Sequence, residues 1–223
     1  LLHLKDAACE KCNDLAALIN QLRAAGVKIA EEKIIEPGSD EGKDIIKKYS
    51  IDFAPTIILS KDAGYYELIQ QAWGQIGSKE TDDAYVFRGG AAYPPFPLIN
   101  LTTGKLRGLV NIVYLADKSC AECYDVSQHR EILVQGFSVK LDKEEAYDIG
   151  DAKGKELAVK YNITKVPAII LSDEIGAYPS SQALRQLFSV EKDGAYVFRQ
   201  VQSVGTYKDL TASQVVKVEQ QEQ

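Results

Sequence analysis

An internal repeat with a period of about 111 residues is the feature that most constrains the fold of this chain. The segment Cys-Glu-Lys-Cys at 9–12 recurs as Cys-Ala-Glu-Cys at 120–123. Ala-Pro-Thr-Ile-Ile-Leu-Ser at 54–60 recurs as Val-Pro-Ala-Ile-Ile-Leu-Ser at 166–172, and Ala-Tyr-Val-Phe-Arg follows in both copies. Solenoid units are far shorter than this period, which is the size of a domain. The sequence therefore predicts two homologous domains in tandem.

The repeat also gives the expected domain boundaries within the 223 residues. We expect one domain over 1–90, a linker or packed strap rich in glycine and proline over 91–106, and a second domain over 107–223 with a polar C-terminal tail. The apolar strand before the second cysteine pair spans Gly108 to Leu115, whereas only Leu1 to Leu4 precede the first pair. The N-terminal strand of the first domain is therefore expected to be truncated.

A strand that begins midway raises the expectation of a segment before Leu1, such as a signal sequence or a membrane anchor. Together with the paired cysteines, this favours an exported or membrane-anchored extracytoplasmic protein over a cytoplasmic one. No apolar run approaches the roughly 20 residues that cross a bilayer, so membrane contact is expected only through such a preceding segment. The net charge of −6 and the absence of a basic block argue against a nucleic-acid partner. The sequence does not indicate an oligomeric state.

Apolar periodicity predicts that strands and helices alternate in each copy. In the first copy we expect strands at 1–4, 27–35, 56–59 and 85–87, and helices at 15–25, 40–49 and 67–76. In the second copy we expect strands at 108–115, 137–141, 169–171 and 196–198. We also expect a first helix that carries Val126, Arg130 and Leu133, and further helices at 154–161 and near 182–188. This order predicts an α/β fold in which each domain has a central mixed β-sheet flanked by helices.

The combination of motifs resembles the thioredoxin fold. In each copy a strand leads to Cys-x-x-Cys, and an x-Pro dipeptide opens a buried strand 46 or 47 residues after the first cysteine. The tandem arrangement is similar to the two-unit protein disulfide oxidoreductases and, more loosely, to protein disulfide isomerase domains. The resemblance covers about residues 1–88 and 107–205.

This resemblance implies thiol–disulfide exchange with protein substrates. Cys9 and Cys120 would be the attacking thiols at helix N-termini, and Cys12 and Cys123 the resolving thiols. The resemblance also implies that Pro55 and Pro167 follow cis peptide bonds beside their own cysteine pairs. The backbone just before each proline would bind substrate. The substrate-binding positions that the resemblance implies are therefore Ala54, Pro55, Val166 and Pro167. Each cysteine pair is expected to form its own disulfide, and no cofactor or metal is assigned.

The residues around the motifs depart from the usual family pattern. Ala8 and Ser119 stand where the family has an aromatic residue, and His3 and Tyr114 occupy the position of its buried acid. Acidic side chains surround both motifs: Asp6, Glu10 and Asp14 in the first copy, and Asp117, Glu122 and Asp125 in the second. Because nearby carboxylates oppose thiolate formation, the sequence predicts mild oxidants at both sites, and Glu122→Gln is expected to lower the Cys120 pKa.

Two other functions are compatible with the same cysteines. The chain could be a structural or protein-binding module, in which the disulfides only staple the helix starts. Alternatively, four thiolates from the two motifs could be brought together as a metal site. Disulfide exchange on protein substrates is the function that the duplicated motif favours.

Overall fold

The computed structural model describes residues 1–91 and 93–218. The chain divides into two compact units, Leu1–Gly108 and Leu109–Gln223. In the described residues, no helix has the length and apolar character needed to cross a membrane.

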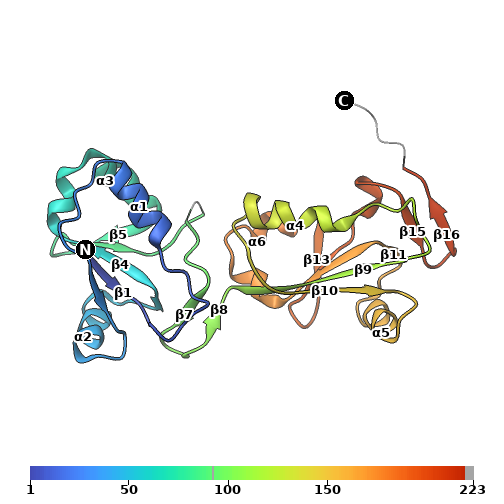
Figure 1. Cartoon of the computed structure of the whole chain (residues 1–223), viewed down its shortest axis with the longest axis horizontal. Helices are drawn as coiled ribbons and strands as arrows, with labels where there is room; N and C mark the ends of the chain where they lie inside the picture. The colour runs from blue at the N-terminus through green and yellow to red at the C-terminus, as the bar shows by residue number, and fades with distance from the viewer. Residues whose placement is uncertain (92, 219–223) are drawn as a thin grey trace. The chain divides into compact units, whose positions relative to one another are not determined.

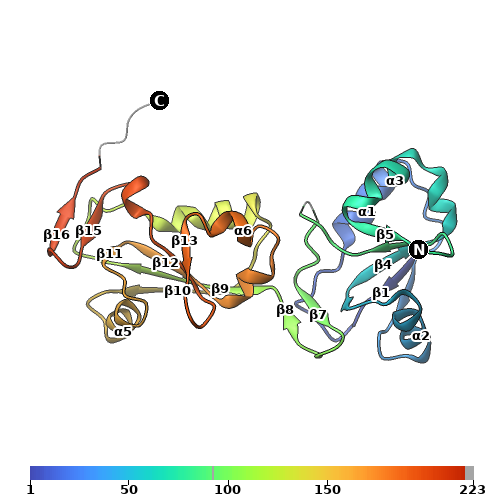
Figure 2. The same cartoon turned by 180° about the vertical axis from the view of Figure 1, so that it is seen from behind.

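The first unit contains a five-stranded mixed sheet with helices on both faces. Its strand order is β2-β1-β4-β6-β5, in which β1 and β2 are parallel and the other neighbours are antiparallel. Figures 1 and 2 show α1 and α3 on one face of this sheet and α2 on the other. The elements are β1 (Leu2–Leu4), α1 (Ala16–Ala24), β2 (Lys33–Ile35), α2 (Asp40–Tyr49), β3 (Phe53–Ala54), β4 (Thr56–Leu59), α3 (Glu67–Ala72), β5 (Gly77–Lys79), β6 (Tyr85–Phe87), β7 (Leu98–Asn100) and β8 (Leu106–Arg107).

Alternation along the central strand builds two cores. Successive side chains of a strand point to opposite faces of the sheet. Ile57 and Leu59 pack with the buried residues of α1 and α3, whereas Ile58 packs with Tyr49 of α2. The fully apolar run of β4 therefore reflects a strand that is buried on both faces.

The second unit has a sheet of the matching order, β10-β9-β12-β14-β13, with β9 and β10 parallel. Figure 1 shows α4 and α6 on one face and α5 on the other. The elements are β9 (Leu109–Ala116), a 3₁₀ turn (Val126–Gln128), α4 (His129–Glu131), a π turn (Ile132–Gly136), β10 (Lys140–Asp148), α5 (Ala152–Lys160), β11 (Lys165–Val166), β12 (Ala168–Leu171), α6 (Ser181–Leu184), β13 (Phe188–Val190), β14 (Tyr196–Phe198), β15 (Tyr207–Asp209) and β16 (Gln214–Val216). The predicted α/β class, with mixed sheets flanked by helices, is thus observed.

Each unit also has a small three-stranded sheet that the sequence did not predict. A hairpin of β7 and β8, called the first hairpin, pairs antiparallel with β3. A hairpin of β15 and β16, called the second hairpin, pairs in the same way with β11. β15 and β16 lie within 207–216, and β7 lies within the expected linker. Strands of two or three residues are too short to give a periodic signal, and their pairing depends on distant partners.

Two arginines in matching positions cap the C-terminal ends of α2 and α5, each of which lies on one face of its sheet. Arg88 donates to the carbonyl oxygens of Tyr49 (2.5 Å) and Ser50 (3.0 Å), where α2 ends. Arg199 donates to those of Tyr161 (2.7 Å) and Asn162 (3.0 Å), just after α5. The last carbonyls of a helix lack partners within the helix, so these arginines satisfy groups that would otherwise be unpaired.

Replacing Arg88 with alanine is expected to destabilise the first unit by about 2 kcal/mol, because the Tyr49 and Ser50 carbonyls at the end of α2 lose charge-assisted hydrogen bonds, of which the one to Tyr49 is partly buried. Trp73 is the single tryptophan and lies in the core of the first unit, so urea unfolding followed by its fluorescence reports that unit. Arg199→Ala should leave the urea midpoint reported by Trp73 unchanged. It should lower the stability of the second unit, which circular dichroism detects. Arg23→Ala, which removes an exposed ion pair with Glu32, should change little. Equal effects of Arg88→Ala and Arg23→Ala would contradict the capping role.

Candidate functional site

Each Cys-x-x-Cys forms a local disulfide. Cys9 and Cys12 are joined, as are Cys120 and Cys123, and the described chain has no free cysteine. The predicted local pairing of the four cysteines is therefore confirmed. All four cysteine residues are half-buried.

The cysteines lie in loops, which corrects their predicted place on the first turn of a helix. Helix α1 begins only at Ala16, and the first helical turn of the second unit begins at Val126. Asx side chains form the intervening turns: Asn13 accepts from the Leu15 N–H, and Asp125 accepts from the Ser127 N–H. These polar side chains compete with the helix for its first hydrogen bonds. The helix dipole therefore acts on the first cysteines from further away than the sequence suggested.

The cysteine loop and the predicted proline lie at the same end of the sheet in each unit. Leu4, the last residue before the first loop, pairs with Thr56, which directly follows Pro55. Leu115 pairs in the same way with Ala168, which follows Pro167. The Ala54–Pro55 and Val166–Pro167 peptide bonds are cis, as predicted, and both prolines are buried. Pairing across the sheet thus brings together parts of the chain that are more than 40 residues apart.

The two hairpins connect the cysteine loops to the strands that precede the prolines. The N–H of Asn13, directly after Cys12, donates to the carbonyl of Pro97 (2.7 Å), and β7 begins at the next residue. In the second unit the N–H of Tyr124, directly after Cys123, donates to the carbonyl of Thr206 (2.8 Å), just before β15. Each loop is therefore anchored on its C-terminal side by its own hairpin.

The same hairpins pair with the predicted substrate-binding residues. Ala54 lies opposite Ile99 of β7, and Val166 lies opposite Lys208 of β15. One edge of each short strand, β3 and β11, is thus occupied by the chain itself. A substrate backbone that bound at this edge would have to replace the hairpin.

Two lysines, one in the second hairpin and one directly after it, form ion pairs with acidic side chains around the second motif. The sequence alone did not reveal these pairs. Lys208 forms an ion pair with Asp117 and lies 3.3 Å from the Ser119 hydroxyl oxygen. Lys217 Nζ lies 2.7 Å from Glu122 Oε2. The hydrogen bond from Lys208 holds the pKa of Asp117 below its usual value. Asp117 and Glu122 are therefore not the uncompensated charges on which the expectation of a mild oxidant rested.

His3 lies at the sequence position where the resemblance would place a buried acid. It is 3 % exposed; its Nδ1 lies 3.3 Å from Glu32 Oε1, and its Nε2 is buried without a hydrogen-bond partner. Burial lowers the pKa of His3, and the hydrogen bond to Glu32 offsets part of this effect. His3 is thus held neutral inside the first unit.

A buried neutral histidine predicts how acid affects the first unit. Because the folded pKa lies below the unfolded value of about 6.5, the contribution of His3 is complete above that pH and is lost as the pH falls through the folded pKa. We expect the urea midpoint reported by Trp73 to fall as the pH drops from 7 to 5, and His3→Leu to flatten this dependence. An unchanged slope in His3→Leu would show that other groups cause it.

No family model and no curated protein matches the sequence.

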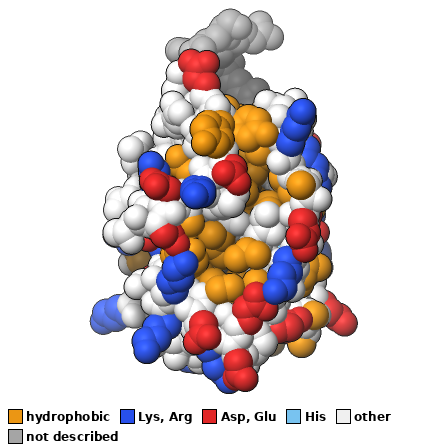
Figure 3. All heavy atoms as spheres, turned by 90° about the vertical axis from the view of Figure 1, so that its left-hand side faces the viewer, with side chains coloured by type: hydrophobic (Ala, Val, Ile, Leu, Met, Phe, Trp, Pro, Cys, Tyr) orange, Lys and Arg blue, Asp and Glu red, His pale blue; other side chains and the backbone are white. Residues whose placement is uncertain are grey.

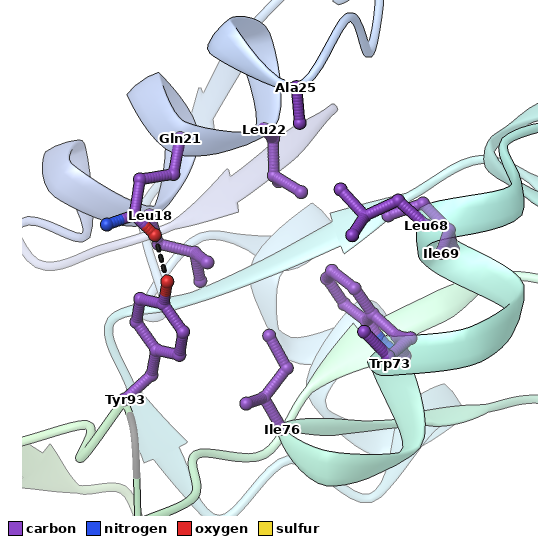
Figure 4. Close-up of a pocket in the computed structure, with 10 residues that line it drawn as sticks. Leu18, Gln21, Leu22, Ala25, Leu68, Ile69, Trp73, Ile76 and Tyr93 are labelled. Carbon is purple, nitrogen blue, oxygen red and sulfur yellow. Dashed lines mark hydrogen bonds between the residues drawn. The ribbon is translucent and has the colours of Figure 1, made fainter.

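An apolar groove lies between α1 and α3 in the first unit, away from the cysteines. It has a volume of about 280 Å³, and no cysteine lines it. Figure 4 shows Leu18, Leu22, Leu68 and Trp73 around this space, with the Tyr93 hydroxyl hydrogen-bonded to Gln21 at its rim. Figure 3 shows hydrophobic side chains among charged ones on the face that lies to the left in Figure 1. None of the predicted site residues lines the groove.

The described part of the chain contains no cluster of side chains suited to a metal site. Among residues 1–91 and 93–218, no three His, Cys, Asp or Glu side chains are grouped so that they could hold a metal ion. With both cysteine pairs joined as disulfides, their sulfurs are also not thiolate ligands.

Proposed function

We propose that this chain is a thiol–disulfide oxidoreductase or isomerase of protein substrates, built from two thioredoxin-like units. The observation that carries the proposal is the repeated neighbourhood of a half-exposed local disulfide and a buried cis-proline at one end of each mixed sheet. Exchange needs a thiolate that attacks a disulfide sulfur and a second thiol that resolves the mixed disulfide. Cys9 and Cys120 fit the first role, and Cys12 and Cys123 fit the second.

The role of Ala54, Pro55, Val166 and Pro167 in substrate binding belongs to the same proposal. Their backbone lies at the sheet end where each cysteine loop begins. Since the hairpins cover one edge of β3 and β11, a bound substrate would use the exposed rim of the cysteine loop or would displace the hairpin. Protein partners with accessible thiols or disulfides suit such a surface site.

The test is catalysis on two protein substrates that differ in what they require. Reduction of insulin by dithiothreitol measures disulfide cleavage, and refolding of scrambled ribonuclease in glutathione buffer measures oxidation and isomerisation. The proposal predicts that the chain accelerates at least one of these reactions well above the buffer rate. Rates equal to those with an equal amount of a protein that has only structural disulfides would reject it.

A structural or protein-binding module is the second candidate function. The hairpins favour it, because they anchor each cysteine loop and fill the edge where a substrate strand would pair. In that function the disulfides would only staple the loops. The two candidates differ in the activity assays above, since a staple has no catalytic turnover.

A further inference from the structure

One side chain of the second hairpin reaches the residues that position Cys120. Asp117 Oδ1 accepts hydrogen bonds from the Ser119 N–H (2.8 Å) and hydroxyl (2.6 Å), and the Asp117 carbonyl accepts the Cys120 N–H (3.0 Å). The ammonium of Lys208 pairs with the other carboxylate oxygen of Asp117. A single carboxylate thus organises the approach to Cys120, and Lys208 neutralises its charge.

The first unit has the matching carboxylate, but different residues at two positions around it. Asp6 Oδ1 accepts the Ala8 N–H (2.8 Å), and the Asp6 carbonyl accepts the Cys9 N–H (3.1 Å). Ile99 of β7 lies opposite Ala54 just as Lys208 of β15 lies opposite Val166, so the two are structurally matched. Ala8 stands where the second unit has Ser119, and it has no hydroxyl. The matched positions therefore differ in both the cation and the hydroxyl.

We propose that Lys208 is a positioning residue of the second redox site, which stabilises the Cys120 thiolate by neutralising Asp117 and thereby makes the Cys120–Cys123 disulfide more oxidising. This inference rests on the proposed exchange chemistry of the cysteines and assigns a residue outside both motifs to its control.

Burial explains why Lys208, rather than its neighbours, has this role. The side chains of Lys208 and Asp117 are 24 % and 7 % exposed, whereas those of Lys217 and Glu122 are 72 % and 63 % exposed. Solvent and salt screen the exposed pair much more strongly than the buried one. The other charged groups of the same region are Lys118 and Asp125 on the loop and Asp148 at the end of β10, whose carboxylate accepts the Lys118 N–H.

The redox step can be followed with glutathione alone. One glutathione thiolate attacks a sulfur of the Cys120–Cys123 disulfide and releases the other sulfur as a thiolate. A second glutathione thiolate then attacks the glutathione sulfur of the mixed disulfide, which yields oxidised glutathione and the protein dithiol. Two electrons pass from two glutathione molecules to the protein, and their two protons go to the cysteines or to solvent. A stabilised Cys120 thiolate favours the reduced protein.

A charge cycle at Lys208 and Asp117 tests the proposal. All variants carry Cys9→Ser and Cys12→Ser, so that only the second site reacts. The Cys120 pKa is measured from the pH dependence of iodoacetamide alkylation, with the labelled residue identified by mass spectrometry. The glutathione equilibrium is measured at a pH above this pKa. Lys208→Met should raise the pKa by about one unit and lower the equilibrium constant for reduction about tenfold.

Three further variants distinguish an effect of charge on the Cys120 pKa from an effect of altered structure. Asp117→Asn should shift the pKa in the opposite direction, the double variant Asp117→Asn/Lys208→Met should return close to the parent, and Lys208→Arg should retain the parent value. Lys153→Met, which removes an exposed lysine paired with Glu156, is the control and should have no effect. Circular dichroism confirms that each variant is folded.

Two results would overturn the proposal. One is an unchanged Cys120 pKa in Lys208→Met, and the other is a double variant that departs from the parent as far as Lys208→Met does. The cycle uses glutathione and alkylation only, so it remains decisive if the chain proves inactive on insulin and ribonuclease. Failure of the proposed function and failure of the role of Lys208 are therefore distinguishable.

Discussion

Replacing Cys9 and Cys120 together with serine is expected to lower insulin reduction at least about a thousandfold, towards the uncatalysed rate. A serine hydroxyl is not ionised near neutral pH and cannot form a disulfide, so both units lose the attacking group. The single variants Cys9→Ser and Cys120→Ser should each retain the part of the insulin-reduction activity that the unaltered unit contributes. The rates of the four proteins, measured at equal concentration, give this partition directly.

The resolving cysteines supply the matched control. Cys12→Ser with Cys123→Ser keeps both attacking thiols, so mixed disulfides with substrate should accumulate and be visible by non-reducing electrophoresis. Cys9→Ser with Cys120→Ser should not trap substrate at Cys12 or Cys123 to the same extent. Equal trapping by the two double variants would contradict the assignment of attacking and resolving roles, and full activity of Cys9→Ser with Cys120→Ser would show that Cys9 and Cys120 are not the attacking thiols.

Alanine at Gly42 or Gly154 is expected to destabilise its unit by about 3 kcal/mol, although alanine normally favours a helix over glycine. A Cβ at Gly42 would lie 2.1 Å from the backbone oxygen of Glu36, and one at Gly154 would lie 1.9 Å from that of Asp148. Both glycines lie in the first turns of α2 and α5, where the incoming chain passes against the helix. Because the contact is with backbone, no side-chain movement relieves it.

Two other glycines make this prediction specific. A Cβ at Gly74 meets nothing within 4 Å, and one at Gly176 comes no closer than 3.8 Å to Tyr196. Gly74→Ala and Gly176→Ala should therefore leave stability within about 0.5 kcal/mol of the parent. Urea unfolding followed by Trp73 fluorescence and by circular dichroism compares the four variants. Similar stabilities for Gly42→Ala and Gly74→Ala would show that α2 shifts to accommodate the methyl group.

Sequence patterns predicted the main sheets well where strands are buried on both faces. The apolar runs at 56–59 and 85–87 are strands, and 40–49 is a helix with Ser39 as its N-cap, which accepts from the Gly42 N–H. Prediction was poorer at edges. The strand expected at 27–35 is observed only as Lys33–Ile35, and that expected at 137–141 begins at Lys140 and continues to Asp148. Edge strands have one partner and a mixed surface, so their sequences carry a weaker periodic signal.

What the sequence determined by itself is local. The spacing of Cys9 and Cys12, and of Cys120 and Cys123, indicates pairs close enough to form their own disulfides, and the family resemblance predicted that both prolines follow cis bonds. Tertiary structure alone decided the surroundings of those pairs. The hairpin that carries Lys208 meets the cysteine loop across a separation of 89 residues in the chain. Electrostatic effects depend on distance in space, so an acid that looks uncompensated in the sequence can be neutralised by a lysine that only folding brings to it.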